Sequence, residues 1–275
     1  MKLDKISERV YTNTDGLSGG NVGIIILGNR VLVVDSQYPV SGADFRRSIG
    51  DITKKRVSHL LLTHVHGDHI LGAQAFDDTN IVSHARVKEK MEENLKTIWT
   101  KEGLKKMVED AKKTQPERAY LYDGVRIVLP TATFQRSLKI GDISIVHTGG
   151  HTDCSSYVYV ADDKILFAGD NLFVGRFPWA GDLTVDPDKW IRALQKYLKM
   201  DIQVIVPGHG PICDKKEVEK QLKWFRFIRR RMRKLITEGA SEDEVVKQSF
   251  LELYPSDHPE RVENGYRAWF RHWRS

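Results

Sequence analysis

Short apolar runs separated by polar turns recur along the first two-thirds of the chain. Two β-branched runs, Val22–Leu27 and Val31–Asp35, flank Gly28-Asn29-Arg30, and this spacing predicts two paired strands joined by a tight turn. The same pattern predicts strands at Val57–Thr63, Val125–Leu129, Ser144–His147, Ser156–Val160, Lys164–Ala168 and Val204–Val206.

Helical spacing of apolar residues appears between and after these runs. Residues from about 84 to 113 are rich in Lys and Glu, which predicts a helical insertion that Gly103 breaks into two helices. Pro187–Leu198 is predicted to be a helix, and residues from about 215 to 275 form a helical C-terminal extension. Because no linker rich in Gly, Ser or Pro interrupts the chain, we expect one α/β domain over residues 1–275.

Composition excludes several classes of protein. The chain has 275 residues, of which 40% are apolar and 29% charged, so it is not disordered, and its apolar runs are too short to span a membrane. The first residues lack the apolar core of a secretory signal, and Cys154 and Cys213 are expected to be reduced thiols. We therefore expect a cytoplasmic protein with no membrane partner.

The net charge of +6 is concentrated in one segment. Between Lys215 and Glu238 there are ten Lys or Arg residues against three Glu, a local +7 that leaves about −1 for the rest of the chain. Apolar residues share this segment at helical spacing, so we expect a helix that packs on the core, with attraction of an anionic substrate or of nucleic acid as the alternatives. Further on, Ser241 and Glu244 have the spacing of a capping box.

The histidines indicate a metal site. Thr63-His64-Val65-His66-Gly67-Asp68-His69 directly follows a predicted strand, and His151, Asp170 and His209 each stand beside a glycine at the end of another. Imidazole nitrogens and carboxylate oxygens are ligands of Zn²⁺, and burying them together without a metal would leave polar groups unpaired. We expect the other five histidines to be ordinary core or surface residues: His59, His84, His147, His258 and His272.

On these motifs the sequence resembles the metallo-β-lactamase superfamily of metallohydrolases. The motif H-x-H-x-D-H is complete, and Gly-His-Thr-Asp, Phe-Ala-Gly-Asp and Pro-Gly-His-Gly follow in the family's order. The resemblance covers roughly residues 10–215 and implies a four-layer αβ/βα sandwich with the metals at one edge of two sheets. It implies that one metal is held by His64, His66 and His151 and the second by Asp68, His69 and His209, with Asp170 bridging. Asp35 matches a position that supports the site without binding metal.

The resemblance also implies a chemistry. Two Zn²⁺ ions per subunit, with Fe or Mn as alternative metals, would supply hydroxide near neutral pH for attack on a carbonyl or phosphoryl centre. Asp68 would orient this nucleophile and pass on its proton, and no Ser or Cys nucleophile is needed.

Asp170 narrows the substrate class. The best-known β-lactamases have cysteine there, whereas aspartate resembles the glyoxalase II, lactonase and phosphodiesterase branches. We expect a small-molecule ester, thioester or lactone as substrate, with weak β-lactamase or phosphodiesterase activity. The alternatives are a nuclease and a persulfide dioxygenase with one iron, while a non-enzymatic metal protein is disfavoured. The basic residues share a helix with a core-packing apolar stripe and do not show the aromatic-basic interleaving typical of a single-strand groove, which argues against a nucleic-acid partner. A homo-oligomer stays open.

Two segments are candidates for substrate selection: the insertion at 84–113 and residues 173–181, which follow Asp170. In the second, Phe173, Phe177 and Trp179 are expected to form an apolar wall, and Arg176 to hold a carboxylate or phosphate. The alternative is that these aromatic residues fill a core between the loop and the insertion.

Overall fold

Two mixed β-sheets lie face to face in the computed structural model, which describes residues 1–16, 19–247 and 259–274. The first sheet has seven strands in the order β1 (Asp4–Lys5), β2 (Val10–Asn13), β3 (Val22–Leu27), β4 (Arg30–Val34), β5 (Arg56–Leu62), β6 (Asn80–His84) and β7 (Ala132–Phe134). The second has five in the order β12 (Val204–Val206), β11 (Ile165–Phe167), β10 (Ser156–Val160), β9 (Ile143–His147) and β8 (Ser137–Ile140).

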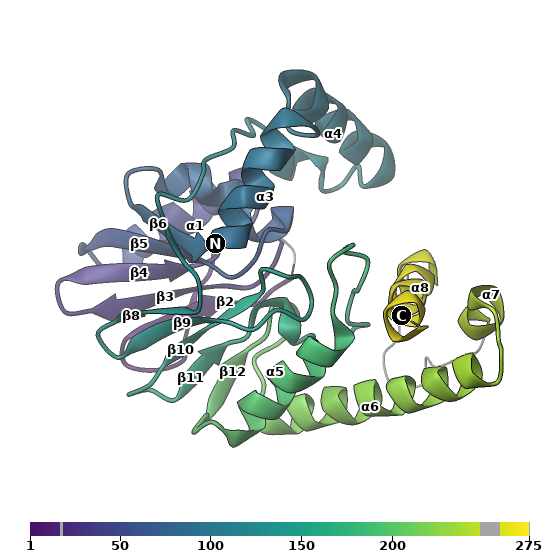
Figure 1. The fold of residues 1–275 in the computed structure, drawn as a ribbon. Coiled ribbons are helices and arrows are strands. Elements are labelled where there is room, and N and C mark those ends of the chain that lie inside the picture. The colour runs from purple at the N-terminus through teal and green to yellow at the C-terminus, as the bar shows by residue number, and fades with distance from the viewer. Residues whose placement is uncertain (17–18, 248–258, 275) are drawn as a thin grey trace.

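Helices cover the outer face of each sheet (Figure 1). On the first sheet lie α1 (Pro39–Ile52), η1 (Leu71–Phe76) and α3 (Ala85–Lys96), and α4 (Lys101–Thr114) extends beyond them. On the second lie α5 (Pro187–Lys199) and α6 (Lys215–Thr237); α8 (Pro259–Arg274) packs on α6, and α7 (Glu242–Val246) packs on α8. The shorter elements are α2 (Gly67–Ile70), η2 (Ala119–Tyr122) and η3 (Gly169–Asn171).

Three apolar cores hold these layers together. Ile25, Leu32 and Val158 belong to the core between the sheets, which consists largely of β-branched residues, as expected for strands that meet face to face. The outer core of the second sheet is rich in aromatic residues, among them Trp190 and Trp269. This αβ/βα arrangement confirms the predicted four-layer sandwich.

Most of the predicted strands are present, but Val125–Leu129 is not one. The amide of Arg126 donates to Oε1 of Gln74 instead of to a neighbouring strand, and the apolar side chains of this stretch pack on the outer core of the first sheet. The free edge of β6 is taken by β7, so the stretch has no ladder to join. An apolar run alone does not distinguish these two outcomes.

The helical insertion is also divided differently from the prediction. The break falls between α3 and α4, and Gly103 lies in the first turn of α4, where its amide donates to Oγ1 of Thr100. A Cβ at Gly103 would meet the carbonyl oxygen of Ile98 at 2.1 Å, so this glycine allows a close approach of the preceding turn. The strands β1, β2, β6, β7 and β8 and the helix α1 were not predicted.

The C-terminal helices agree with their pattern. The buried residues of α6 include Leu222, Phe225 and Ile228, and Ser241 and Glu244 form the predicted capping box. His258 lies outside the described residues. In the described part of the chain, no helix is both long and apolar enough to cross a bilayer.

Candidate metal centre

The predicted ligands gather at one edge of the two sheets because each follows the end of a strand. His64 and His66 come just after β5, and α2 then presents Asp68 and His69. The remaining three come from the second sheet: His151 from the turn between β9 and β10, Asp170 from η3 after β11, and His209 after β12.

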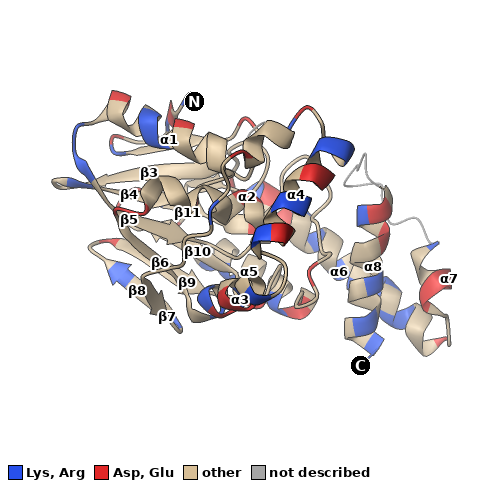
Figure 2. Ribbon diagram, turned by 90° about the horizontal axis from the view of Figure 1, so that it is seen from above, with Lys and Arg blue, Asp and Glu red and all other residues tan. Residues whose placement is uncertain are grey.

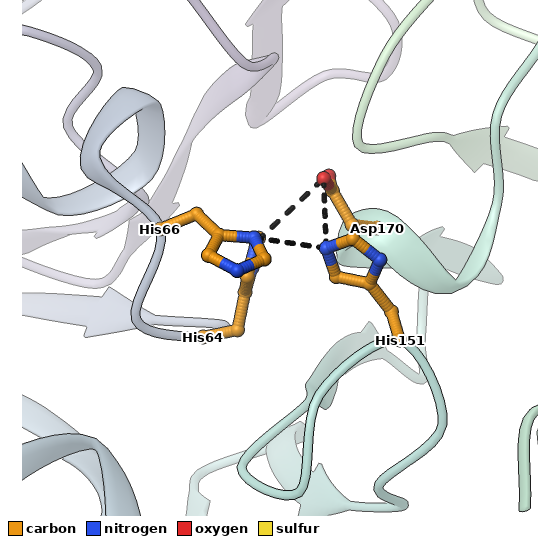
Figure 3. A group of neighbouring side chains, drawn as sticks. All are labelled: His64, His66, His151 and Asp170. Carbon is orange, nitrogen blue, oxygen red and sulfur yellow. Dashed lines mark hydrogen bonds and ion pairs between the residues drawn. The ribbon is translucent and has the colours of Figure 1, made fainter. Parts of the chain in front are cut away.

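Four of these side chains form a first cluster. The ligand atoms of His64, His66, His151 and Asp170 all lie within 4.8 Å of one another, and Figure 3 shows the four pointing toward a common centre. Nε2 of His151 is 2.9 Å from Nδ1 of His66 and 3.4 Å from Oδ2 of Asp170. Ligands bonded tetrahedrally to one ion at 2.0–2.2 Å stand about 3.4 Å apart, so these spacings suit one metal.

The other three side chains form a second cluster. The ligand atoms of Asp68, His69 and His209 lie within 4.8 Å of one another, and Nε2 of His209 is 3.2 Å from Oδ2 of Asp68. Asp170 reaches this cluster too, because its Oδ1 is 3.1 Å from Nε2 of His69 and its Oδ2 is 3.4 Å from Nε2 of His209. Asp170 thus lies between the two clusters.

Hydrogen bonds behind the imidazoles determine which nitrogen faces the centre. Nδ1 of His69 contacts Oδ2 of Asp35 at 2.8 Å, and Nδ1 of His151 contacts the carbonyl oxygen of Trp179 at 3.0 Å. Carboxylate and carbonyl oxygens only accept, so in both rings Nδ1 carries a proton and Nε2 is the nitrogen whose lone pair a metal would bind.

Outward hydrogen bonds also orient the rings of His64 and His66. The hydroxyl of Thr63 donates to Asp35, so it accepts from Nδ1 of His64 at 3.0 Å and leaves Nε2 facing inward. His66 is reversed: Nε2 donates to Oδ2 of Asp182 at 3.1 Å, and Nδ1 faces the centre. Such outer partners orient metal-binding histidines and raise their basicity.

Glycines let the backbone come this close. A Cβ at Gly208 would lie 2.0 Å from Oδ1 of Asp170, and one at Gly20 would lie 2.3 Å from the ring of His69. Any side chain at either position would collide with a predicted ligand or its neighbour.

The pKa values differ between the clusters. Burial lowers the pKa of His151 to about 3. Burial also opposes charge in the second cluster, but there the carboxylates of Asp170 and Asp68 raise the pKa of His209 to about 9 and that of His69 well above its ordinary value. Against the effect of burial, the same imidazoles hold the pKa of both carboxylates below their usual range. The imidazoles of the second cluster therefore hold protons that His151 in the first cluster does not.

The residues fit divalent metal ions. Nε2 of His64 and Oδ1 of Asp170 are buried and have no hydrogen-bond partner, and inward lone pairs of His66 and His151 face each other. Only a cation satisfies several lone pairs that converge in this way, since two acceptors repel.

The loop after Asp170 divides its aromatic residues between two roles. Phe177 packs against Trp224, Tyr266 and Trp269 in the outer core, so the prediction that it lines a substrate pocket is wrong. Its buried position follows from the C-terminal helices, which close over this side of the loop.

The other three predicted substrate residues lie differently. Phe173 is buried with its ring stacked on that of His209 at 5.3 Å, so it supports a ligand instead of forming an open wall. Trp179 is only partly buried, with its ring 5.0 Å from that of His66. Arg176 is exposed. Of the four predicted substrate residues, Trp179 and Arg176 are therefore the two that are not buried.

Sequence reasoning missed Thr63 and Asp182 as outer partners of the histidines. Asp182 stands one residue beyond the segment 173–181 that was singled out, and an Asp two residues before Thr184 is a common turn pattern that could have indicated it. Thr63 directly precedes the histidine motif and carries no local signal of its role.

The groups expected to be ordinary residues behave as such where the structure describes them. His84 and His147 stack on each other at 3.9 Å, and both bond to backbone carbonyls away from the centre. His59 contacts the hydroxyl of Ser58. The prediction of reduced thiols is confirmed, as Cys154 and Cys213 are both free.

Comparisons with known proteins agree with this geometry. A family model described as the metallo-beta-lactamase superfamily matches residues 15–209. A relative from Caenorhabditis elegans, named beta-lactamase-like protein 2 homolog, is 24% identical over 266 residues, which cover 94% of this chain and 79% of the relative. A linear primary-alkylsulfatase from Pseudomonas sp. (strain ATCC 19151) is 24% identical over 257 residues, 82% of this chain and 48% of its own length.

Solved structures share the fold. The DIM-1 metallo-beta-lactamase aligns with a TM-score of 0.64 and 18% identity over 82% of this chain and 97% of that structure. The metallo-beta-lactamase from Pontibacter korlensis aligns with a TM-score of 0.62 and 20% identity over 82% and 98%. Since the family model covers more than half of the sequence, the chain belongs to the metallo-beta-lactamase superfamily, most of whose members are metal-dependent hydrolases.

Proposed function

We propose that the site is a hydrolytic centre for two Zn²⁺ ions, with Fe or Mn as alternative metals. The first ion would be held by His64, His66 and His151, the second by Asp68, His69 and His209, and both by Asp170. The observation that carries the proposal is the set of outward hydrogen bonds, which leave lone pairs converging from two sides on Asp170.

The residues divide the work of hydrolysis. When bound, a pair of such ions acidifies water and neutralises negative charge that develops on the substrate. Asp68 is the most exposed of the seven predicted ligands, with 23% of its side chain accessible, so it can reach water at the mouth of the site. We assign to Asp68 the orientation of the attacking water and acceptance of its proton.

The proposed substrate is a small molecule with an ester, thioester or lactone bond, as in the glyoxalase II and lactonase branches. Asp170 at the shared position supports this branch. The partly exposed ring of Trp179 would contact the apolar part of the substrate, and Arg176 an anionic part. Because two relatives are named for β-lactamase likeness and alkyl sulfates, β-lactams and alkyl sulfate esters belong in the test panel.

We propose that the basic helix α6 is a scaffold and not a nucleic-acid surface. Its apolar side is buried under α5 and α8, and Arg229 and Arg233 pair with Asp188. Figure 2 shows acidic residues beside the basic ones on this part of the molecule. These pairs lower the positive field that a phosphate backbone would need.

The test combines metal analysis with a substrate panel. We expect two equivalents of zinc per chain and hydrolysis of esters, thioesters or lactones in preference to phosphodiesters, β-lactams and RNA. Asp68→Asn is expected to lower kcat/KM by about 10²-fold or more, whereas the control Asp162→Asn at an exposed position is expected to leave it unchanged. One iron per chain with oxygen uptake would overturn the proposal in favour of a dioxygenase, and preferential RNA cleavage in favour of a nuclease.

A further inference from the structure

A chain of hydrogen bonds connects helix α3 of the insertion to the predicted ligand His66. It starts at Lys90, whose side chain is only 14% exposed and whose Nζ lies 2.9 Å from Oγ1 of Thr184 and 2.7 Å from Oδ1 of Asp153. The ammonium group is thus held between two segments that also supply or support metal ligands, the turn after His151 and the loop after Asp170.

The hydroxyl of Thr184 connects Lys90 to Asp182, and all of its hydrogen-bonding positions are used. Oγ1 donates to Oδ1 of Asp182 at 2.5 Å, and it accepts from Nζ of Lys90 and from the amide of Asp153 at 3.1 Å. A hydroxyl has one donor and two acceptor positions, and all three are occupied here. Any rotation of the Thr184 side chain would therefore break at least one of these bonds.

Asp182 is clamped in turn. Its Oδ1 receives the hydroxyl and also the amide of Thr184 at 2.8 Å, while its Oδ2 receives Nε2 of His66. Because Oδ1 faces two donors, only the other oxygen can serve the imidazole. The bonds from Thr184 therefore fix the Asp182 carboxylate, and the carboxylate in turn keeps the proton of His66 on Nε2.

We infer that Lys90 and Asp182 are positioning residues for the first metal, which keep Nδ1 of His66 facing Nε2 of His151. Asp182 bonds His66 directly, and Lys90 acts on Asp182 through Thr184 and through an ion pair at 3.8 Å. This inference rests on the proposed two-metal function. It gives the helical insertion a role at the centre, although α3 contributes none of the seven predicted ligands.

Asparagine at position 182 is the decisive variant. The two donors of Thr184 require an oxygen at Oδ1, so the amide NH₂ of Asp182→Asn faces Nε2 of His66 and drives the ring proton to Nδ1, where the metal should bind. Asp182→Ala removes the partner without imposing the wrong tautomer. The inference therefore expects Asn to be more damaging than Ala, whereas a merely structural role predicts the opposite.

The measurement is the affinity for Zn²⁺ by competition with a chromophoric chelator, together with the visible spectrum of Co²⁺-loaded protein. We expect Asp182→Asn to weaken the first site about 10- to 100-fold and change the cobalt spectrum, with a smaller loss for Thr184→Val and Lys90→Met. Lys90→Arg, which keeps the positive charge, is expected to lose much less affinity than Lys90→Met. Lys96→Met on the exposed end of the same helix is the control. Adding Lys90→Met to Asp182→Asn should cause little further loss, since both act along one path.

Unchanged affinity and spectrum in Asp182→Asn, or a greater loss in Asp182→Ala, would overturn the inference. If Asp182→Asn does not fold, Thr184→Val and Lys90→Met decide: affinities equal to that of Lys96→Met contradict the inference. A wild-type protein that binds no metal pair contradicts the proposed function itself. A wild type with two metals and hydrolytic activity, but variants with normal affinity, contradicts only the positioning role.

Discussion

The two halves of the centre are supported by different parts of the fold. The first cluster depends on a loop, because two of its imidazoles bond outward to the carbonyl of Trp179 and the carboxylate of Asp182. In the second cluster His69 bonds to Asp35, which directly follows the central strand β4 and also accepts from the amide of Thr63 after β5. The first half is thus held mainly by a loop and a helical insertion, with His64 tied to Asp35 through Thr63, and the second by neighbouring strand ends.

The halves also differ in charge, and the difference indicates what each requires. Each cluster has one carboxylate behind an imidazole, Asp35 behind His69 and Asp182 behind His66, but Asp182 is paired with Lys90. Asp68 belongs to the second cluster alone, so a cation there meets more negative charge. The first cluster presents three imidazoles around the shared carboxylate of Asp170. We expect the second position to bind metal by charge, and the first to depend on the accuracy with which its loop holds the rings.

The largest effect is expected where the two halves meet. Asp170→Ala removes the carboxylate that faces both predicted clusters, so metal content should fall at both positions and kcat/KM by about 10³-fold or more. Metal analysis and steady-state kinetics on the purified variant test this, with Asp162→Ala at an exposed position as the control. Unchanged metal content and turnover would show that Asp170 is not shared.

A second variant addresses the half built on strand ends. Asp35 has φ of 57°, which Asn tolerates, but both of its oxygens accept bonds from Thr63 and His69, so Asp35→Asn places an NH₂ against a buried donor. We expect a loss of about 1–3 kcal/mol in the free energy of unfolding. We also expect about 10- to 100-fold weaker binding at the second position.

Thermal unfolding and chelator competition measure these two losses. The matched comparison is Asp182→Asn, which should weaken the first position and cost less stability because its loop is more exposed. If Asp35→Asn weakens the first position as much as Asp182→Asn does, the division into two differently supported halves is wrong.

Protons provide a third test. In the metal-free protein His209, with its pKa raised to about 9, is charged at pH 7, whereas His151, with its pKa lowered to about 3, is neutral. Because metal binds the neutral imidazole, filling the second position at pH 7 should release protons, and filling the first should release few. Calorimetric titration in buffers of different ionisation enthalpy measures the release, which should decline as pH rises through about 9.

The same shifts affect the stability of the metal-free protein. The raised pKa of His209 stabilises the folded state below the unfolded value of about 6.5, and this contribution is lost as pH rises through about 9. The lowered pKa of His151 acts in the opposite sense, because the unfolded chain binds its proton first as pH falls from about 6.5 toward 3. For the calorimetric titration, a proton release on metal binding that does not change with pH would contradict the difference in protonation between the two clusters.

The smallest effects are expected at the mouth of the site. Arg176→Ala and Trp179→Ala should each change the free energy of unfolding by less than about 1 kcal/mol, since one side chain is exposed and the other only partly buried. Arg176→Ala should lower the preference for anionic over neutral substrates, and Trp179→Ala the preference for apolar ones. Kinetics on paired substrates, with melting temperature and metal content, measure these effects. A large fall in melting temperature with unchanged preference would mean that both residues only pack.

Local sequence patterns were sufficient to predict many of the helices and strands. The strands β3 and β10 match their predicted bounds, because β-branched runs between turn residues have few alternatives. The stretch 125–129 was predicted wrongly because it depends on a contact with η1, which is distant in sequence. The break before α4 was misplaced because Gly103, interpreted as a helix breaker, instead lets the first turn of α4 approach the carbonyl of Ile98. The helix α1 was missed for want of a clear apolar stripe, and several of its buried positions are small residues.

The sequence by itself determined the chemical identity of the centre. His64, His66, Asp68 and His69 stand in a short motif at a strand end, and strand ends also carry the other three candidates, so convergence at a sheet edge follows from local spacing. Tertiary structure alone decided which nitrogen of each ring faces inward, because Asp182 and the carbonyl of Trp179 reach the rings through a loop with no regular periodicity. It also decided that Phe177 packs under the C-terminal helices while Trp179 stays at the mouth. The physical reason is that spacing along the chain determines which residues can meet, whereas packing between distant segments determines how their side chains are oriented.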